Sequence, residues 1–302
     1  MGLLSELPRR PRRLGVLAAT LATGLGMVAM AIGGAPVRYL AINGAALIIG
    51  IAMMAILLRS RADNEEGNGA FILVGALGLL ATAMFGMTID GTARWVRVGV
   101  VALQPSLILL PLMIIAYARL PNRMGTLGMI VAALALALQP DRAMAATLVA
   151  GLAVVLLNRR DRQTLGAFLA AVVGFAVTLL QPETLPATPF VEQVFAGAFA
   201  FSPLAGLVML TGVAILMLPA VVRGATTNTF LALWMMIFAA AVFGNYPTPL
   251  LGYGGSGIIG YLLCLTALPQ DVERRVRFRK DAEPRPRDGT DGHSFSTPMM
   301  AS

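Results

Sequence analysis

Long apolar segments recur along this chain from Leu14 almost to Pro269, and they constrain its fold more than any other feature. Each is close to the roughly 20 residues that a helix needs to cross a bilayer. Hydrophobic residues make up 57% of the sequence and charged residues 13%. Soluble domains contain fewer hydrophobic and more charged residues than this. We therefore expect an all-α integral membrane protein with about ten transmembrane helices, at 14–33, 38–58, 70–88, 97–118, 124–139, 143–158, 164–181, 200–222, 229–244 and 248–269.

The basic residues predict how these helices are oriented. With a cytoplasmic N-terminus, nineteen of the 23 lysines and arginines fall on the cytoplasmic side, and only Arg38, Arg94, Arg97 and Arg142 fall outside. This asymmetry follows the positive-inside rule, so both termini are expected in the cytoplasm. The chain then divides into a basic N-terminus (1–13), a polytopic membrane domain (14–269) and a basic, disordered cytoplasmic tail (270–302) that begins near anionic lipid.

Composition excludes several classes of function. The net charge of +8 is spread over short clusters between apolar runs, which argues against a nucleic-acid partner. The single cysteine, Cys264, cannot form a disulfide within the chain, and the lone His293 excludes a histidine-based metal site or catalytic triad. The basic start followed by an apolar run resembles a signal peptide, but many apolar segments follow, so we interpret it as an uncleaved first helix.

The less ordinary residues gather at the predicted outer face. Leu-Gln-Pro occurs three times at or near this boundary, with Gln104, Gln139 and Gln181. Proline ends or kinks helices, which is one explanation of the repeat. The other is that the three amides line a polar cavity, because an amide within the membrane must face protein or water.

Two outer carboxylates have different surroundings. Asp141 follows the Gln139–Pro140 break, and aspartate there is suited to cap the next helix. Glu192 follows two prolines and enters the apolar stretch VFAGAFAF, where desolvation should raise its pKa. Such a carboxylate suits a general base that accepts a proton from a sugar hydroxyl. The same sequence pattern is also expected of an interfacial glutamate that points to water and has no catalytic role.

Two further outer segments allow two readings each. The stretch ARWVR, with Arg94, Trp95 and Arg97, is either an interfacial aromatic anchor or a site for an anionic headgroup such as pyrophosphate, whose oxygens suit the arginine fork. The stretch GNYPTPLLGYGGSGIIGYL (244–262) is rich in glycine where a membrane helix is expected. Its glycines either let helices pack closely or interrupt the helix and turn backbone N–H groups toward an anion.

Taken in order, these motifs resemble the RodA/FtsW (SEDS) family of cell-shape and cell-division proteins. The family's G-x-x-R-W loop leading into Q-P-S-E corresponds to Gly91, Arg94, Trp95, Gln104, Pro105 and Ser106. Its Q-P-D corresponds to Gln139, Pro140 and Asp141, and its terminal S-Y-G-G-S segment to Tyr253, Gly254, Gly255 and Ser256. Its outer L-P-E-x-H-T-D-F segment resembles LPATPFVEQVFA with one extra residue, which puts Glu192 at the aspartate position.

The departures fall in the segments that carry the family's chemistry. Leu107 replaces the glutamate of Q-P-S-E, and Arg142-Ala143 replaces the pair that follows Q-P-D. The large outer loop is shortened to about 181–200, and the carboxylate is glutamate instead of aspartate. The sequence thus describes a divergent and shortened member.

The resemblance implies a multi-pass protein of the bacterial inner membrane that polymerises lipid-linked disaccharide into peptidoglycan at the outer face. Glu192 would be the catalytic base. Arg94, Arg97 or Arg142, with or without a divalent cation, would stabilise the leaving pyrophosphate. The remaining predicted substrate contacts are Trp95, Gln104, Ser106, Gln139, Asp141, Tyr253, Gly254, Gly255 and Ser256. No other cofactor is expected, and the expected partners are membrane lipids and a single-pass transpeptidase (penicillin-binding protein).

Two alternatives belong to other functional classes. The first is a non-catalytic relative that acts as a scaffold or regulator of division or elongation, which Leu107 favours. The second is a transporter or flippase that uses the same outward cavity. The retained acid at Glu192 favours the enzyme.

Overall fold

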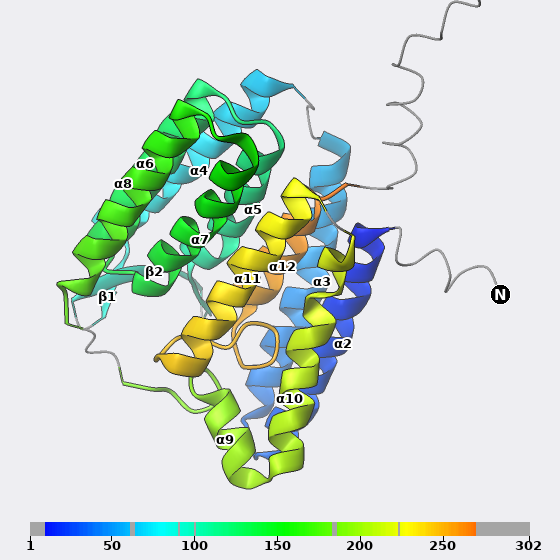
Figure 1. Cartoon of the computed structure of the whole chain (residues 1–302). Helices are drawn as coiled ribbons and strands as arrows, with labels where there is room; N and C mark the ends of the chain where they lie inside the picture. The colour runs from blue at the N-terminus through cyan, green and yellow to red at the C-terminus, as the bar shows by residue number, and fades with distance from the viewer. Residues whose placement is uncertain are drawn as a thin grey trace, which may run out of the picture.

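The computed structural model describes residues 10–60, 64–89, 91–99, 101–182, 186–222 and 224–269 (Figure 1). The predicted tail, most of the basic N-terminus, and the outer acids Asp90 and Glu183 lie outside the described residues. The helices are α2 (Pro11–Ile32), α3 (Val37–Ser60), α4 (Glu65–Phe85), α5 (Pro105–Arg119), α6 (Arg123–Leu138), α7 (Arg142–Arg159), α8 (Arg162–Leu179), α9 (Val194–Phe201), α10 (Pro203–Leu216), α11 (Ala225–Phe243) and α12 (Gly255–Leu265), with a short 3₁₀ helix, η2 (Leu218–Val221).

Each of the ten predicted spans contains one of the helices α2 to α8 or α10 to α12, so the all-α membrane architecture is confirmed. Within the described residues, α2, α3, α4, α7, α8 and α11 are long and apolar enough to cross a membrane, whereas α5, α6, α10 and α12 are shorter. The extra helix, α9, is only 8 residues long and lies between α8 and α10.

Three predicted boundaries were wrong. The span 97–118 begins too early, because β2 (Thr92–Val98) and β3 (Val101–Leu103) precede α5. The span 200–222 is interrupted at Ser202, whose extended backbone separates α9 from α10 and whose side chain caps α10. The span 248–269 includes a loop up to Gly254, because α12 begins only at Gly255.

The outer connection before α5 is a small antiparallel sheet with strand order β1-β2-β3, in which β1 is Met87–Ile89. Met87 pairs with Trp95, and Val96 pairs with Leu103. β-branched Thr92, Val96 and Val98 suit this extended backbone. The sheet lies beside the lower ends of the α4–α8 helices in Figure 1.

The interior is built around α12 and α5. α12 packs against α2, α3 and α5, and every one of its residues is buried. α5 is buried along almost its whole length, including Tyr117. Both helices consist almost entirely of apolar residues and glycine, which suits a helix enclosed by protein on every side.

The connections meet in two groups at opposite ends of the bundle. At one end, Asn122 donates to Glu65 O (2.5 Å) and Arg12 donates to Leu268 O (2.7 Å), which joins the predicted cytoplasmic segments. At the other end, the sheet, the 139–142 turn and the loops at 186–193 and 244–254 contact one another through the hydrogen bonds described below. Successive connections between helices therefore lie at opposite ends of the bundle, as the distribution of basic residues predicted.

Candidate functional site

A buried polar network joins four segments at the outer end. The Gln104 side chain donates to Asp141 Oδ2 (3.0 Å) and to the Tyr246 hydroxyl (2.8 Å). Ser106 Oγ donates to the same Asp141 oxygen at 2.8 Å. The Gln104 backbone N–H donates to Ser256 Oγ (2.9 Å), which ties the start of α5 to the start of α12.

Asp141 is the centre of this network. It is 0% exposed, and its second oxygen accepts from the Met144 N–H at 3.2 Å, so it caps α7 as the sequence predicted. Burying a carboxylate is costly unless hydrogen bonds satisfy it, and three donors do so here. The geometry gives Asp141, Gln104, Ser106 and Ser256 a positioning role, and their contact with substrate stays a prediction.

Arg94 and Gln139 form a second buried contact beside this network. Arg94 is 4% exposed and donates to the backbone carbonyls of Gln139 (Nε, 3.5 Å) and Pro140. The Gln139 side chain donates to Leu79 O at 2.6 Å. Arg94 therefore anchors the sheet to the 139–142 turn. Neither hypothesis for ARWVR, the interfacial anchor or the headgroup site, predicted this structural role.

The other predicted polar contacts lie nearer the surface. Arg97 is exposed, with Nη2 3.6 Å from Met87 Sδ, and Trp95 is half-buried. Arg142 is half-buried, and its guanidinium donates to Gln181 O at 3.0 Å. Of the three outer arginines predicted to meet pyrophosphate, Arg97 is the exposed one, whereas Arg94 is buried and Arg142 half-buried.

The structure supports the proline explanation of the Leu-Gln-Pro repeat in two of its three copies. α6 ends at Leu138 before Gln139, and α8 ends at Leu179 before Gln181, so proline marks a helix end in these two copies. In the first copy Pro105 instead begins α5. Gln104 and Gln139 are buried against protein, whereas Gln181 is exposed, so the three amides do not line one cavity.

In the glycine-rich stretch, the N–H groups of residues 252–254 bond to oxygens of the protein, so they are not available to an anion. The N–H groups of Gly252, Tyr253 and Gly254 donate to Thr248 O (3.0 Å), Phe190 O (2.6 Å) and Asn43 Oδ1 (3.1 Å) respectively. Farther along, a Cβ on Gly260 would lie 2.1 Å from Leu107 O. Close packing therefore describes Gly260, whereas residues 252–254 form a loop before α12 whose N–H groups bond to protein oxygens.

Leu107, at the position of the family's glutamate, is part of this packing. It is 3% exposed, and its side chain lies 3.5 Å from where a Cβ on Gly257 would sit. A carboxylate here would face the α5–α12 contact. An apolar side chain at position 107 therefore fits the apolar contact between α5 and α12.

Glu192 lies in the loop 186–193 between α8 and α9. One carboxylate oxygen accepts from the Thr188 N–H at 2.8 Å. The loop is fixed to 244–254 by Thr248 N–H to Val191 O (2.8 Å) and by the Gln193 amide to Asn245 Oδ1 (3.0 Å). Gln193, beside it, has a left-handed backbone (φ 57°), a strained conformation that surrounding contacts must hold in place.

The environment of Glu192 changes its acidity. Burial raises the pKa of the Glu192 carboxyl above its ordinary 4.5, although the Thr188 N–H opposes this by stabilising the carboxylate. The shift is in the direction predicted from the apolar sequence that follows it. A half-buried carboxylate with a raised pKa is a better proton acceptor than an exposed one.

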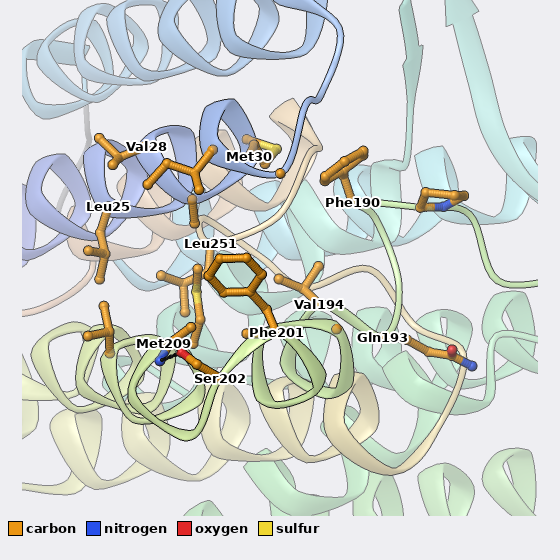
Figure 2. A pocket seen from close by; sticks show the side chains of 18 of the residues that line it. Leu25, Val28, Met30, Phe190, Gln193, Val194, Phe201, Ser202, Met209 and Leu251 are labelled. Atoms are coloured by element: carbon orange, nitrogen blue, oxygen red, sulfur yellow. Dashed lines mark hydrogen bonds between the residues drawn. The ribbon is translucent and has the colours of Figure 1, made fainter.

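Glu192 lines an apolar groove of about 750 Å³. In Figure 2, α2 forms one wall and α9 and α10 the other, with Leu25, Phe201 and Met209 between them and Gln193 at one end. The lining is apolar except for Thr188, Glu192, Gln193 and Ser202. Among the described lining residues there is no lysine or arginine.

Sequence reasoning missed several residues of this outer end. Tyr246 completes the Asp141 network, and Asn43 holds the 252–254 loop by accepting from Gly254 and donating to Gly252 O (2.9 Å). Tyr39 stacks on Tyr253 with ring centroids 3.8 Å apart. A polar Asn43 inside a predicted apolar span was the one available signal, because an amide there needs a protein partner.

The described residues offer no ready cation site. Nowhere in the described ranges do three His, Cys, Asp or Glu side chains gather at metal-binding distance. The oxygens of Asp141 are occupied by hydrogen-bond donors. These residues do not fit a divalent cation, so the function proposed below contains no step through one.

Several solved structures have the same fold as this chain. The crystal structure of Thermus thermophilus rod shape determining protein RodA has a TM-score of 0.59 at 21% identity, with 83% of this chain and 93% of that chain covered. An aspartate-to-alanine mutant of that protein gives a TM-score of 0.58 at 22% identity, with 83% and 94% covered. A structure titled as the structural coordination of polymerization and crosslinking by a peptidoglycan synthase complex gives 0.57 at 20% identity, with 83% and 94% covered.

Sequence comparison agrees with the fold. No curated protein matches the chain significantly. The profile of the FtsW/RodA/SpoVE family, described as cell cycle protein, matches residues 14–184, which is more than half of the chain. This multi-pass membrane protein therefore belongs to the FtsW/RodA/SpoVE family.

Proposed function

We propose that this protein is a peptidoglycan glycosyltransferase of the bacterial inner membrane that polymerises lipid-linked disaccharide at the outer face. The observation that carries the proposal is Glu192. It is a half-buried carboxylate with a raised pKa, fixed by the Thr188 N–H in the lining of an apolar groove. Family membership adds support, and so does the fold shared with a protein of a peptidoglycan synthase complex.

The chemistry assigned to Glu192 is proton transfer. Its carboxylate takes the proton from the acceptor's sugar hydroxyl, and the hydroxyl oxygen attacks the anomeric carbon of the donor. The bond from that carbon to the pyrophosphate oxygen breaks, and polyprenyl pyrophosphate leaves with inversion at the carbon. Arg94, Arg97 or Arg142 would meet the leaving charge, and Arg97 is the exposed one of these three.

The expected partner follows from the same comparison. A structure of similar fold belongs to a complex that couples polymerization and crosslinking. Crosslinking of the new strand is the reaction of a transpeptidase. We propose that a single-pass transpeptidase binds this chain in the membrane and crosslinks the strands that it makes.

The test is Glu192→Gln in purified protein supplied with labelled lipid-linked disaccharide. Glutamine keeps the shape and removes the base, so polymerisation should fall by about two to four orders of magnitude. Glu192→Asp should keep partial activity, because a carboxylate remains one methylene short. Glu66→Gln, an exposed glutamate in the first turn of α4 at the opposite end, is the matched control and should leave the rate unchanged.

A specific observation favours a second candidate function, that of a non-catalytic scaffold. The residues that match Q-P-S and Q-P-D are buried in packing contacts, and Leu107 stands in place of a carboxylate. A non-catalytic scaffold of the division or elongation machinery would need this packing and no base. Wild-type protein without glycan synthesis, together with full complementation of a deletion by Glu192→Gln, would establish the scaffold and refute the enzyme.

A further inference from the structure

The Glu192 loop (186–193) contains turns but neither helix nor strand, and it rests on the facing loop, 244–254. Two backbone hydrogen bonds join the loops: Thr248 N–H to Val191 O (2.8 Å) and Tyr253 N–H to Phe190 O (2.6 Å). A carboxylate on a loop without regular structure keeps its place only through such contacts. The position of Glu192 therefore depends on how firmly the facing loop is held.

The backbone on both sides of this contact is strained. Phe190 and Gln193 in the Glu192 loop and Leu250 in the facing loop have φ angles of 66°, 57° and 62°. Residues with a Cβ rarely adopt these left-handed values, and such values persist only where surrounding contacts hold the chain. Strain of this kind lets the two loops shift when one of those contacts is removed.

The Tyr246 side chain ties the facing loop to the protein interior. Tyr246 is 3% exposed, and its hydroxyl accepts from the Gln104 side-chain N–H at 2.8 Å. The same nitrogen lies farther from its other two partners, at 3.0 Å from Asp141 Oδ2 and 3.2 Å from Ser106 Oγ. Asn43 bonds to the other end of this loop, so a tie near its start comes from Tyr246.

Tyr246 and Glu192 occupy corresponding places in the two loops. The residues directly before and after Glu192 are each bonded to a residue on one side or the other of Tyr246. These two hydrogen bonds are Thr248 N–H to Val191 O (2.8 Å) and Gln193 Nε2 to Asn245 Oδ1 (3.0 Å). A shift of the backbone at Tyr246 is therefore passed to both chain neighbours of Glu192.

From this arrangement we infer that Tyr246 is a positioning residue for Glu192: its hydroxyl, bound by Gln104, fixes the loop that holds both chain neighbours of Glu192. The inference rests on the proposed function, because it assigns the residue that keeps the base of that reaction in place. Tyr246 does not line the groove, so it acts through Glu192 and not by contact with a ligand there. A small displacement of a reacting group lowers a catalytic rate strongly, which is why one buried hydroxyl matters.

The experiment is Tyr246→Phe in the purified full chain, supplied with labelled lipid-linked disaccharide. Phenylalanine keeps the ring and removes the hydroxyl, so kcat for polymerisation should fall about ten- to a hundredfold. KM should stay unchanged, because Tyr246 does not line the groove. The pH limb of the rate should also move to lower pH, since a loosened loop exposes Glu192 and brings its pKa closer to the ordinary 4.5.

Tyr117→Phe is the matched control. It also removes a buried tyrosine hydroxyl, one that lies 2.9 Å from Thr126 Oγ1 at the opposite end of the bundle. This variant should lose stability but keep kcat and the pH limb, which separates positioning from a general loss of stability. Tyr246→Phe added to Glu192→Gln should not lower the residual rate further, because two changes that act through one group are not additive. A further tenfold loss would show that Tyr246 acts on another group and overturn the inference.

Hydrogen exchange separates this inference from the proposed function, because it needs no activity. Peptides that cover 186–193 and 244–254 should exchange faster in Tyr246→Phe than in the wild type, and at the wild-type rate in Tyr117→Phe. If the wild type polymerises but Tyr246→Phe keeps its kcat and pH limb, the inference is wrong and the enzyme stands. If exchange is faster as expected but the wild type makes no glycan, the hold of Tyr246 on the Glu192 loop stands and the enzyme is wrong. Unchanged exchange in Tyr246→Phe would refute the coupling of the two loops whatever the activity.

Discussion

Asp141 and Asp161 show how one residue type acquires different roles from its surroundings. Both cap a helix, accepting from Met144 N–H (3.2 Å) and Thr164 N–H (2.8 Å) respectively. Asp161 lies at the predicted cytoplasmic end, where burial opposes the charge, but hydrogen bonds from Thr164 outweigh it and hold the pKa of Asp161 below its ordinary value. Asp141 is fully buried and satisfies two further side-chain donors.

This contrast predicts unequal effects of the same substitution. Asp141→Asn places an amide donor against the donors of Gln104 and Ser106, so the free energy of unfolding should fall by about 1–3 kcal/mol. Asp161→Asn should change it by a few tenths of a kcal/mol, because asparagine caps helices as well as aspartate does. Unfolding in detergent measures both, and equal losses would contradict the central role of Asp141.

The pH dependence of polymerisation tests Glu192 independently of mutation. A base acts as the carboxylate, and burial raises the pKa of Glu192 above 4.5. The rate should therefore rise with pH through a limb centred above that value and level off once the carboxylate is ionised. Rates measured over roughly pH 4–8 should show this limb in the wild type. The residual rate of Glu192→Gln should lack it, and a limb that survives in this variant would assign the titration to another group.

At the scale of elements, close backbone approach decides where helices sit. Gly260 of α12 lies so near Leu107 O of α5 that a Cβ would reach 2.1 Å. Both helices are short, α12 is fully buried and α5 almost wholly so, which puts their contact in the interior of the bundle. The glycine-rich stretch is thus a packing device in α12 and a loop before it.

Gly260→Ala should therefore destabilise the protein. The added methyl group meets a backbone oxygen that cannot rotate away, so α5 and α12 must separate, at a cost of about 1–3 kcal/mol. Gly166→Ala on α8, where no atom lies within 4 Å of the new Cβ, should be neutral or slightly stabilising. Thermal unfolding of the two variants in detergent compares them, and an unchanged Gly260→Ala would show that α12 shifts freely.

At the scale of the whole molecule, the bundle has two chemically different ends. Short arginine-bearing turns gather at one end, and the sheet, the Asp141 network and the Glu192 loop gather at the other. The groove opens at the second end between α2 and α9–α10.

The orientation in the membrane can be tested on a single helix. Gln163 and Gln181 are both exposed and flank α8 at its opposite ends. A membrane-impermeant thiol reagent added to intact cells should label Gln181→Cys and leave Gln163→Cys unlabelled, as the positive-inside rule requires. The native Cys264 is buried and gives little background. The reverse labelling would invert the topology and place Glu192 on the cytoplasmic side.

The sequence alone predicted ten spans, the alternation of their connections and the resemblance to the family. These depend on length, hydropathy and arginine position, which are local properties that a bilayer imposes on any chain. It also determined that Glu192 meets apolar surroundings, because the residues that desolvate it include its own neighbours along the chain.

Only the tertiary structure decided what the other polar residues do. Arg94 and Gln139, or Gln104 and Tyr246, are 45 and 142 residues apart in the chain, and no local pattern indicates that they touch. The groove is likewise made by α2 and α10, which lie far apart in sequence. Hydrogen bonds and cavities are set by distances between segments, and these distances exist only once the helices have packed.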